Sequence, residues 1–305
     1  MVRLVRECVQ VRMAESRIKQ IQQFIRRMPS LSTTVAKVLE ICNNPAASAN
    51  DLNRVISYDP VLTAQVLKLI NSAFYGLPNR IPSLVRAIIM LGINTVKNLV
   101  LASSVLAACK GISNTGKVTI NDFWAHCLGV GVLSKMIAAM DQVPLSDHEE
   151  YFVAGLLHDL GKLPLMACFP DLYRVAISSA KESDRPLVES EIANIGIDHC
   201  QVGGLIATKW NLGVSMQDAI KKHHVLEGAE HLDFMVRCIG TANLLVNHFE
   251  IGTAGDYSVN PMLLKNCLES MGLSMDALSG LKLKMECEIE KASVFLQIAV
   301  TGARP

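Results

Sequence analysis

Apolar residues recur with helical spacing along most of the chain. Residues 15–28 form a basic amphipathic pattern that stops at Pro29, and a Ser/Thr cluster at 30–34 precedes the apolar repeat VAKVLEIC. Few stretches alternate polar and apolar residues as a half-buried strand would. The pattern therefore predicts an all-α fold, in which an N-terminal helical bundle packs on a second helical domain.

Proline and glycine mark the predicted helix boundaries in the first third of the chain. The segments NDLNRVISYDP and DPVLTAQVLKLINSAFYG each end at one of these residues, which favours two successive helices. In IPSLVRAIIMLG, Pro82 lies at the predicted start and Gly92 just beyond the end, as is typical of helix termini. The apolar segment NTVKNLVLASSVLAAC then predicts a further helix.

The best candidate for a domain boundary is KGISNTGKVTIND, residues 110–122, which is rich in Gly, Ser, Asn and Thr. We therefore predict an N-terminal bundle over 1–115 and a helical domain with the candidate chemistry over 116–250. Residues 251–305 open with GTAGDYSVNP and are predicted to form C-terminal helices.

The composition restricts the class of protein and its partners. The chain has 305 residues, of which 50% are hydrophobic and 19% charged, so we expect a soluble globular protein. Lys and Arg number 29 against 28 Asp and Glu, which gives no global basic field to attract a nucleic acid. The one basic segment, RIKQIQQFIRR, has only Phe24 as a stacking platform. These features argue against a nucleic-acid partner.

The cysteines and the apolar segments indicate the compartment. Nine cysteines occur singly, without a C-x-x-C pair and without a secretory signal at the N-terminus, which favours reduced thiols in a cytoplasm. The most apolar long segment, residues 99–109, is shorter than the ~20 residues that a membrane span needs. We expect a buried helix there, a cytoplasmic protein and no membrane partner.

The segment LLHDLGKLPL places His158, Asp159 and Lys162 within an apolar run. Each of these groups costs free energy to desolvate unless it is paired. Neighbouring residues on a helix diverge by roughly 100°, so His158 and Asp159 can face one centre only where the helix ends. Gly161 supplies such an end. The same argument applies to His223 and His224 near the end of VSMQDAIKKHH.

Further polar groups in this part of the chain predict a metal site. Asp122 and His126 are four residues apart, so they share a helix face. Imidazole and carboxylate together suit first-row transition metals, here iron or manganese with zinc as an alternative, better than calcium or magnesium. The set of imidazoles and carboxylates is too large for one closed tetrahedral site and suits two metals. The candidate imidazoles are those of His126, His158, His199, His223 and His224.

Asp159 is the expected bridge between two such metals. A metal pair of this kind clamps the attacking and the leaving oxygen of a phosphoryl transfer. Lys162, one turn beyond Asp159, would neutralise developing negative charge. The competing interpretation is that each histidine is an ordinary core residue bonded to a carbonyl. Recurrence of the polar groups within one block favours the site, whereas His148, His231 and His248 lie in polar or mixed sequence and are predicted at the surface.

The order of these residues resembles a known superfamily. His126, HDLGK, His199 and the HH pair follow the layout of the HD superfamily of metal-dependent phosphohydrolases, most closely its HD-GYP branch. As a whole, the chain is similar to HDOD proteins, the HD-related output domains of bacterial signalling. The phrases DPVLTAQVLKLINSAFYG, LPNRIPSLVRAIIMLG, NTVKNLVLASSV, FVAGLLHDLGKLPL and WNL carry this resemblance, which covers roughly residues 20–250.

The resemblance implies roles for individual residues. The HD-GYP pattern implies metal ligation by His126, His158, Asp159, His199, His223 and His224, with Asp122 as a further acidic ligand and Lys162 beside the metals. Two departures are visible. Asn243 in IGTANLL stands where the family has an aspartate and is expected to be a weaker, neutral metal ligand. The segment after His224 has no Gly-Tyr-Pro loop, which argues against cyclic di-GMP hydrolysis.

Two functions remain open from the sequence. The first is a signal-transduction output module that keeps an HD-like metal site and acts by binding a partner protein or a nucleotide, without turnover. The second is an active phosphohydrolase on a nucleotide or phosphodiester, with Asp159 and Lys162 as catalytic residues.

Overall fold

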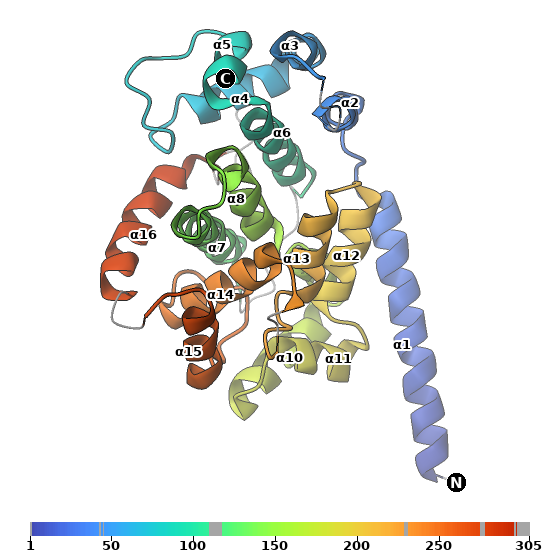
Figure 1. Cartoon of the computed structure of the whole chain (residues 1–305). Coiled ribbons are helices and arrows are strands. Elements are labelled where there is room, and N and C mark those ends of the chain that lie inside the picture. The colour runs from blue at the N-terminus through green and yellow to red at the C-terminus, as the bar shows by residue number, and fades with distance from the viewer. Residues whose placement is uncertain are drawn as a thin grey trace. The chain divides into compact units, whose positions relative to one another are not determined.

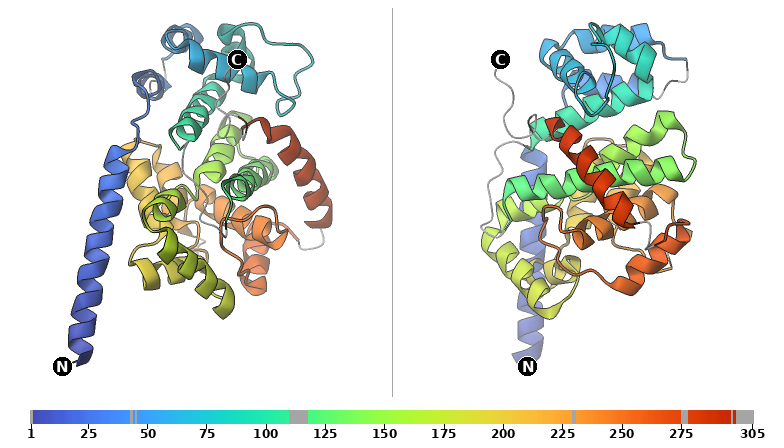
Figure 2. Two further views of the ribbon diagram at one scale, coloured as in Figure 1. Left: turned by 180° about the vertical axis from the view of Figure 1, so that it is seen from behind. Right: turned by 90° about the vertical axis from the view of Figure 1, so that its left-hand side faces the viewer.

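The computed structural model describes residues 2–42, 44, 46–109, 118–228, 231–274, 278–295 and 297. Within these residues the chain forms sixteen α-helices and one short 3-10 helix, with no strand (Figure 1). Views from behind and from the side show the same purely helical architecture (Figure 2). The prediction of an all-α protein is confirmed.

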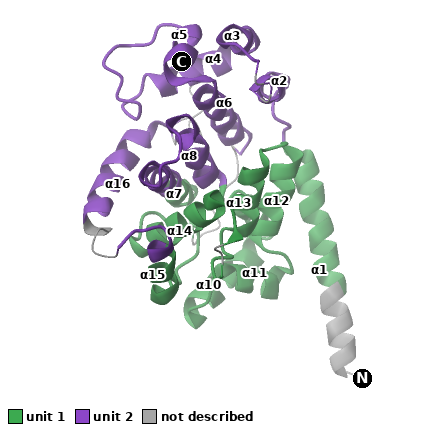
Figure 3. Cartoon of the chain, viewed as in Figure 1, with its two compact units in different colours: residues 1–28, 112–127, 158–267 green, residues 29–111, 128–157, 268–305 purple. Residues whose placement is uncertain are grey.

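Contacts divide the chain into two compact units, neither of which is continuous in sequence (Figure 3). Unit 1 comprises 1–28, 112–127 and 158–267, and unit 2 comprises 29–111, 128–157 and 268–305. This grouping follows contacts, so the domain boundaries expected at 115 and 250 stay a prediction. The segment proposed as a boundary, 110–122, lies mostly outside the described residues.

Unit 1 contains most of the histidines discussed above. Its helices are α1 (Val2–Arg27), the first residues of α7 (Ile120–Met140), α9 (Lys162–Cys168), α10 (Pro170–Ser183), α11 (Leu187–Ile195), α12 (His199–Lys209), α13 (Val214–Lys222), α14 (Phe234–His248) and most of α15 (Pro261–Ser270). Helices α12, α13 and α14 pack in succession, and α9 packs on α1, α10 and α12. The Lys209 ammonium donates to the carbonyls of Ile25 and Met28, both at 2.7 Å, which satisfies carbonyls that the end of α1 leaves free.

Unit 2 is organised around α6. Its elements are α2 (Thr33–Cys42), α3 (Ala49–Ser57), α4 (Pro60–Ile70), α5 (Leu84–Leu91), α6 (Ile93–Ala108), the rest of α7, η1 (Leu145–Asp147), α8 (His148–Leu157) and α16 (Leu278–Ala292). Helix α6 packs against α2, α4, α5 and α8. It is buried over most of its surface, as a helix that is apolar all round must be. The buried helix expected at 99–109 is confirmed.

Local sequence explains where several helices of unit 2 begin and end. Ser48 and Asp51 form a reciprocal capping box at the start of α3. The Asp59 carboxylate accepts from the Leu62 backbone amide at 2.9 Å, and Pro60 opens α4. Gly92 ends α5 at a φ of 87°, a conformation that residues with a Cβ avoid. The start of α4 at Pro60 and the end of α5 at Gly92 agree with the prediction from Pro and Gly, whereas α4 already ends at Ile70, before Gly76, and α5 begins at Leu84, after Pro82.

Helix α7 is long and apolar enough to cross a membrane, and the bent pair α5–α6 meets the same criterion if it counts as one span. Of the most apolar stretch of α7, however, 72% is buried within the protein. A core helix shows this combination, so length and composition alone do not indicate a membrane span.

One histidine that was predicted at the surface is instead buried. His148 is 9% exposed, and its Nε2 lies 2.8 Å from the Val143 carbonyl oxygen. The prediction was wrong because the start of α8 packs against η1, which the mixed local sequence does not reveal. His231 and His248 are exposed as expected.

Candidate metal centre

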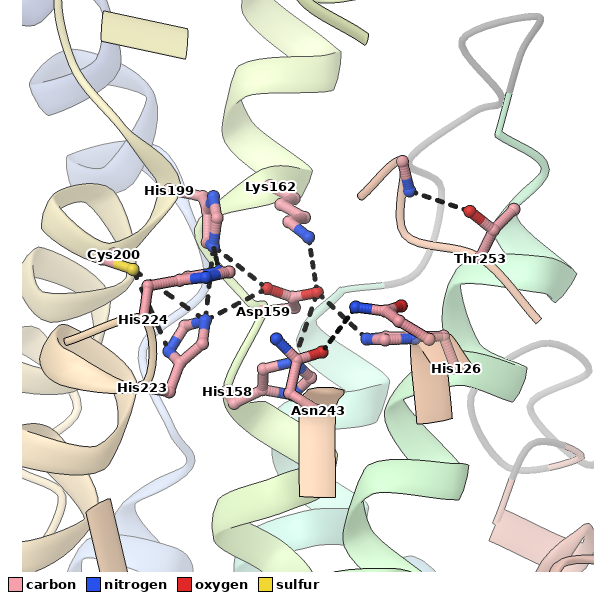
Figure 4. Close-up of polar contacts among 12 residues, drawn as sticks. His126, His158, Asp159, Lys162, His199, Cys200, His223, His224, Asn243 and Thr253 are labelled. Atoms are coloured by element: carbon pink, nitrogen blue, oxygen red, sulfur yellow. Dashed lines mark hydrogen bonds and ion pairs between the residues drawn. The ribbon is translucent and has the colours of Figure 1, made fainter. Parts of the chain in front are cut away.

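The two oxygens of Asp159 face two separate groups of imidazole nitrogens. Oδ1 lies 3.3 Å from His199 Nε2 and 3.7 Å from His223 Nε2. Oδ2 lies 3.3 Å from His158 Nε2 and 3.6 Å from His126 Nε2. Figure 4 shows His199 and His223 on one side of the carboxylate, His126 on the other side and His158 below it. The structure thus brings the predicted bridging residue and its predicted neighbours into one buried cluster.

Helix ends place the adjacent pairs, as the sequence argument required. Helix α8 ends at Leu157 and α9 begins at Lys162, so His158 and Asp159 lie in the connection and both face the cluster. Helix α13 ends at Lys222, and His223 is its C-cap. The predictions of a helix end at each pair are confirmed.

A close helix approach brings His199 to Asp159. A Cβ built on Gly161 would lie 1.9 Å from the His199 carbonyl oxygen and 2.5 Å from the Gly203 amide nitrogen. No side chain fits there, so only glycine allows the start of α9 to lie against the start of α12. Gly161 therefore allows Asp159 to lie close to His199 and the imidazoles beside it.

Hydrogen bonds fix the orientation of two of the rings. Nδ1 of His199 lies 2.7 Å from Glu191 Oε2, and a carboxylate only accepts, so Nδ1 donates. Glu191 also accepts from the Tyr173 hydroxyl at 3.0 Å. Nδ1 of His223 lies 3.1 Å from the Ile220 carbonyl oxygen. Both rings therefore direct Nε2 toward Asp159, which is the usual arrangement behind a metal-binding histidine.

The charges in the cluster are those that a cation site needs. Burial lowers the pKa of His126 to about 3, although Asp159 opposes this shift. Burial, together with the neighbouring imidazoles, also lowers the pKa of His223 and His224 well below the usual value. Burial alone would raise the pKa of Asp159, but His158 and Lys162 hold it well below its usual range. Neutral imidazoles and an ionised carboxylate are the forms that bind metals.

His199 differs from the other imidazoles. Burial lowers its pKa, but the Glu191 carboxylate raises it, and the result lies well above the usual value. Without a metal, His199 therefore tends to hold a second proton on Nε2, the atom that faces Asp159. A metal cation at that position would replace this proton.

Lys162 is buried beside the bridge. Its Nζ lies 2.7 Å from Asp159 Oδ2, and the side chain is 1% exposed. Burial lowers the pKa of this amine, but Asp159, Asp256 and Glu191 together raise it above the usual value. Lys162 is thus a charged group next to the Asp159 carboxylate, the predicted metal bridge.

The nitrogen positions fit a bound transition metal. His199 Nε2 lies 3.4 Å from His223 Nε2 and 3.2 Å from His224 Nε2. Two nitrogens bound to one zinc at tetrahedral angles lie about 3.3 Å apart, because each Zn–N bond is about 2.0–2.1 Å. In the other group, both ring nitrogens of His126 are buried without a hydrogen bond of normal geometry to any described residue. The donor set and the spacing therefore suit divalent transition metals.

Asp122 does not join this cluster. Its carboxylate is exposed and accepts a 2.6 Å hydrogen bond from the Thr119 hydroxyl at the start of α7. The Asp122 carbonyl accepts from the Thr253 amide, and a Cβ on Gly252 would lie 2.5 Å from the His126 amide nitrogen. Both residues lie in α7, but Asp122 is exposed whereas His126 is buried, so the expectation that the two side chains reach one site is wrong. The Asp122 carboxylate takes part in helix capping and not in the group of His126, His158 and Asp159.

A cavity of about 690 Å³ opens beside the cluster. His223, His224 and Asn243 line it, so the position that departs from the HD-GYP pattern lies at the wall of this cavity. Asn243 is 3% exposed and is close enough to His126 to affect its pKa. Asp256 lines the same cavity, and its Oδ1 is buried without a hydrogen-bond partner among the described residues.

Sequence reasoning missed Glu191, Tyr173, Cys200 and Asp256. A signal for Glu191 existed, because it lies between Leu187 and Ile195 at spacings of four on the buried face of α11. A carboxylate on such a stripe needs a buried partner. Asp256 lies in a segment without helical periodicity, and nothing local indicates its position.

Comparison with known proteins identifies the family of this chain. The HDOD domain profile matches residues 28–226, more than half of the chain. The chain belongs to the HDOD family. This HDOD chain is also 24% identical over 226 residues to an uncharacterized protein of Treponema pallidum (strain Nichols), a match that covers 73% of the chain and 43% of that protein. The chain thus spans less than half the length of this curated relative.

Solved structures share the HDOD fold. An HDOD domain protein of unknown function from Geobacter sulfurreducens has a TM-score of 0.71 and 23% identity, covering 92% of this chain and 97% of that one. A presumed phosphohydrolase from Shewanella amazonensis has a TM-score of 0.69 and 22% identity, covering 92% and 98%. At these identities the similarity establishes the fold alone.

We expect Gly161→Ala to abolish metal binding, because the added methyl group would collide with the His199 carbonyl and separate the two halves of the cluster. Metal content of protein purified without chelator measures this. Gly280→Ala is the matched control, since nothing lies within 4 Å of a Cβ there. A Gly161→Ala protein with as much metal as the parent would contradict the proposed constraint.

We expect Glu191→Gln to weaken metal binding by roughly 10–100-fold, because the uncharged amide holds the His199 ring less firmly. Competition with a chromophoric chelator measures the affinity, and circular dichroism reports on folding. Glu182→Gln, on an exposed position of α10, is the control and should leave the affinity unchanged. Equal affinities of the two variants would rule out the orienting role.

Proposed function

We propose that this protein is an HDOD-type signal-transduction output module that keeps a dinuclear metal centre and uses it to bind a ligand or partner. The position of one carboxylate between two groups of imidazole nitrogens carries the proposal. Each oxygen of Asp159 faces a different pair of rings, so each can serve a different cation. Asp159, His126 and His158 hold one cation, and Asp159, His199, His223 and His224 hold the other.

The adjoining cavity provides the ligand site in this proposal. Its charged lining residues are Asp184, Glu189, Glu227 and Asp256, and no Lys or Arg occurs among its described lining residues. A dinucleotide with two phosphates would meet negative charge away from the metals, and such repulsion costs free energy. The cavity therefore favours a ligand with a single anionic group directed at the metals, such as a nucleoside monophosphate.

The absence of membrane and nucleic-acid partners and the cytoplasmic location remain predictions from composition. A bacterial origin is likewise implied by the family and not by the site.

The alternative is a metal-dependent phosphohydrolase, and the position of Lys162 favours it. A charged lysine 2.7 Å from the bridging carboxylate is placed to stabilise negative charge that develops on a phosphoryl group. When bound, a pair of divalent metals would supply Lewis-acid activation of a phosphoester. Burial lowers the pKa of Lys162, but Asp159, Asp256 and Glu191 together raise it above the usual value, so the amine stays charged.

We expect the parent protein to bind two equivalents of iron, manganese or zinc and His126→Ala to bind one. The double variant Asp159→Asn/Lys162→Met should bind none, because it lacks the carboxylate that both cations share. Lys162 is replaced as well because, without Asp159, its buried ammonium would lose its ion-pair partner. Elemental analysis of protein purified without chelator or nickel affinity measures the stoichiometry.

Asp122→Asn is the control for this series and should keep both equivalents, because its carboxylate lies outside the cluster. If the parent protein binds one equivalent of metal, and both His126→Ala and the double variant lose it, the centre is mononuclear and not dinuclear. A folded parent without metal would remove the basis of the proposal.

Binding and turnover are separable with three probes, AMP, cyclic di-GMP and bis(p-nitrophenyl) phosphate. For the output module we expect metal-dependent binding of AMP in calorimetry, weaker binding of cyclic di-GMP and no product from any probe. Metal-dependent product formation that Lys162→Met abolishes would establish the hydrolase instead. The assays need aerobic and anaerobic arms, because iron centres change oxidation state.

A further inference from the structure

Cys200 lies within the metal centre although its spacing in the sequence gives no sign of this. It is the second residue of α12, directly after His199, and it is 7% exposed. Its Sγ lies 3.9 Å from both ring nitrogens of His223. Figure 4 shows the sulfur on the same side of Asp159 as His199, His223 and His224.

The distances fit a common cation. One ligand atom from each of His199, Cys200, His223 and His224 can be chosen so that all four lie within 4.8 Å of one another. A sulfur and a nitrogen bound to one zinc at tetrahedral angles lie about 3.6 Å apart, because Zn–S is about 2.3 Å and Zn–N about 2.0–2.1 Å. The observed 3.9 Å between Sγ and His223 Nε2 is within a few tenths of an ångström of this spacing.

The rest of the molecule has no comparable cysteine among the described residues. Cys109 is also buried, at 4% exposed, but it lies outside both groups of potential metal ligands found among the described residues. An ordinary packed thiol needs apolar neighbours only. Three imidazoles with nitrogens within 4.8 Å of a thiol sulfur and of one another provide the donors of a nitrogen–sulfur metal site.

We propose that Cys200 is a sulfur ligand of the cation held by His199, His223 and His224. This inference rests on the metal centre of the proposed function and adds the ligand chemistry of one half. The two halves then differ: the half with Cys200 is soft, and the half with His126, His158 and Asp159 contains only nitrogen and oxygen donors.

The asymmetry has a consequence for metal choice. Thiolate ligands favour zinc or iron, whereas oxygen-rich sites suit manganese. The Cys200 half therefore selects against manganese, and the two positions can hold different metals. A metal bound at sulfur would also deprotonate the thiol outright.

Cobalt(II) is the probe for this proposal. The folded parent, stripped of metal and loaded with Co²⁺, should show a thiolate-to-cobalt charge-transfer band in the near ultraviolet. Zinc-loaded parent should show one sulfur at about 2.3 Å in X-ray absorption. Cys200→Ser should lose the band and the sulfur scatterer while His126→Ala keeps both.

Cys109→Ser is the matched control, because it removes a buried thiol that lies outside the cluster. It should leave the band unchanged. The parent spectrum decides the matter even if Cys200→Ser does not fold. If the parent protein binds two equivalents of metal but shows no sulfur ligand, the role of Cys200 is wrong and the dinuclear centre is retained. If the parent protein binds no metal, both the role of Cys200 and the metal centre are wrong.

Discussion

The structure of unit 1 depends on one buried negative charge. Asp159 is fully buried, and an isolated carboxylate in that position would cost several kcal/mol or more. Lys162 compensates it directly at 2.7 Å, and four imidazole nitrogens lie within 3.7 Å of its two oxygens. Lys162 already pairs with the charge, so the imidazole nitrogens around the carboxylate are additional polar groups. Neutral imidazoles beside an ionised carboxylate are what a cation site needs, because their lone pairs bind a cation that brings the positive charge.

The surrounding elements keep this arrangement in place through packing and hydrogen bonds. Gly161 lets α9 and α12 approach each other, and the chain from Tyr173 through Glu191 to His199 fixes one ring from behind. In a regular helix, neighbouring side chains diverge by roughly 100°. Because helices end at 158–161 and 222–224, the adjacent residues there can direct both side chains at the same cluster. Local backbone geometry and long-range packing thus serve the same purpose, which is to direct ring nitrogens at one carboxylate.

The two readings of function differ in what the centre does with its ligand, and the geometry bears on both. Lys162 forms an ion pair with Asp159 at 2.7 Å, which is the basis of the hydrolase alternative. The cavity beside the candidate metal centre carries acidic charge and lacks basic groups among its described lining residues. These features favour recognition of a small ligand over the turnover of a dinucleotide. Membership of the HDOD family, matched over residues 28–226, supports the proposed output role.

The sequence alone determined the helical class, the capped starts of α3 and α4 and the break after Leu157, because these depend on residues within four positions of one another. It also identified His126, His158, Asp159 and Lys162 as a group, since buried titratable residues in apolar helices must find partners. Only the tertiary structure decided that Asp122 caps a helix, that Glu191 supports His199 and that Cys200 adjoins His223. These pairings depend on which helices pack together. Helical periodicity places a residue on one face of its own helix but does not specify which helix packs against that face.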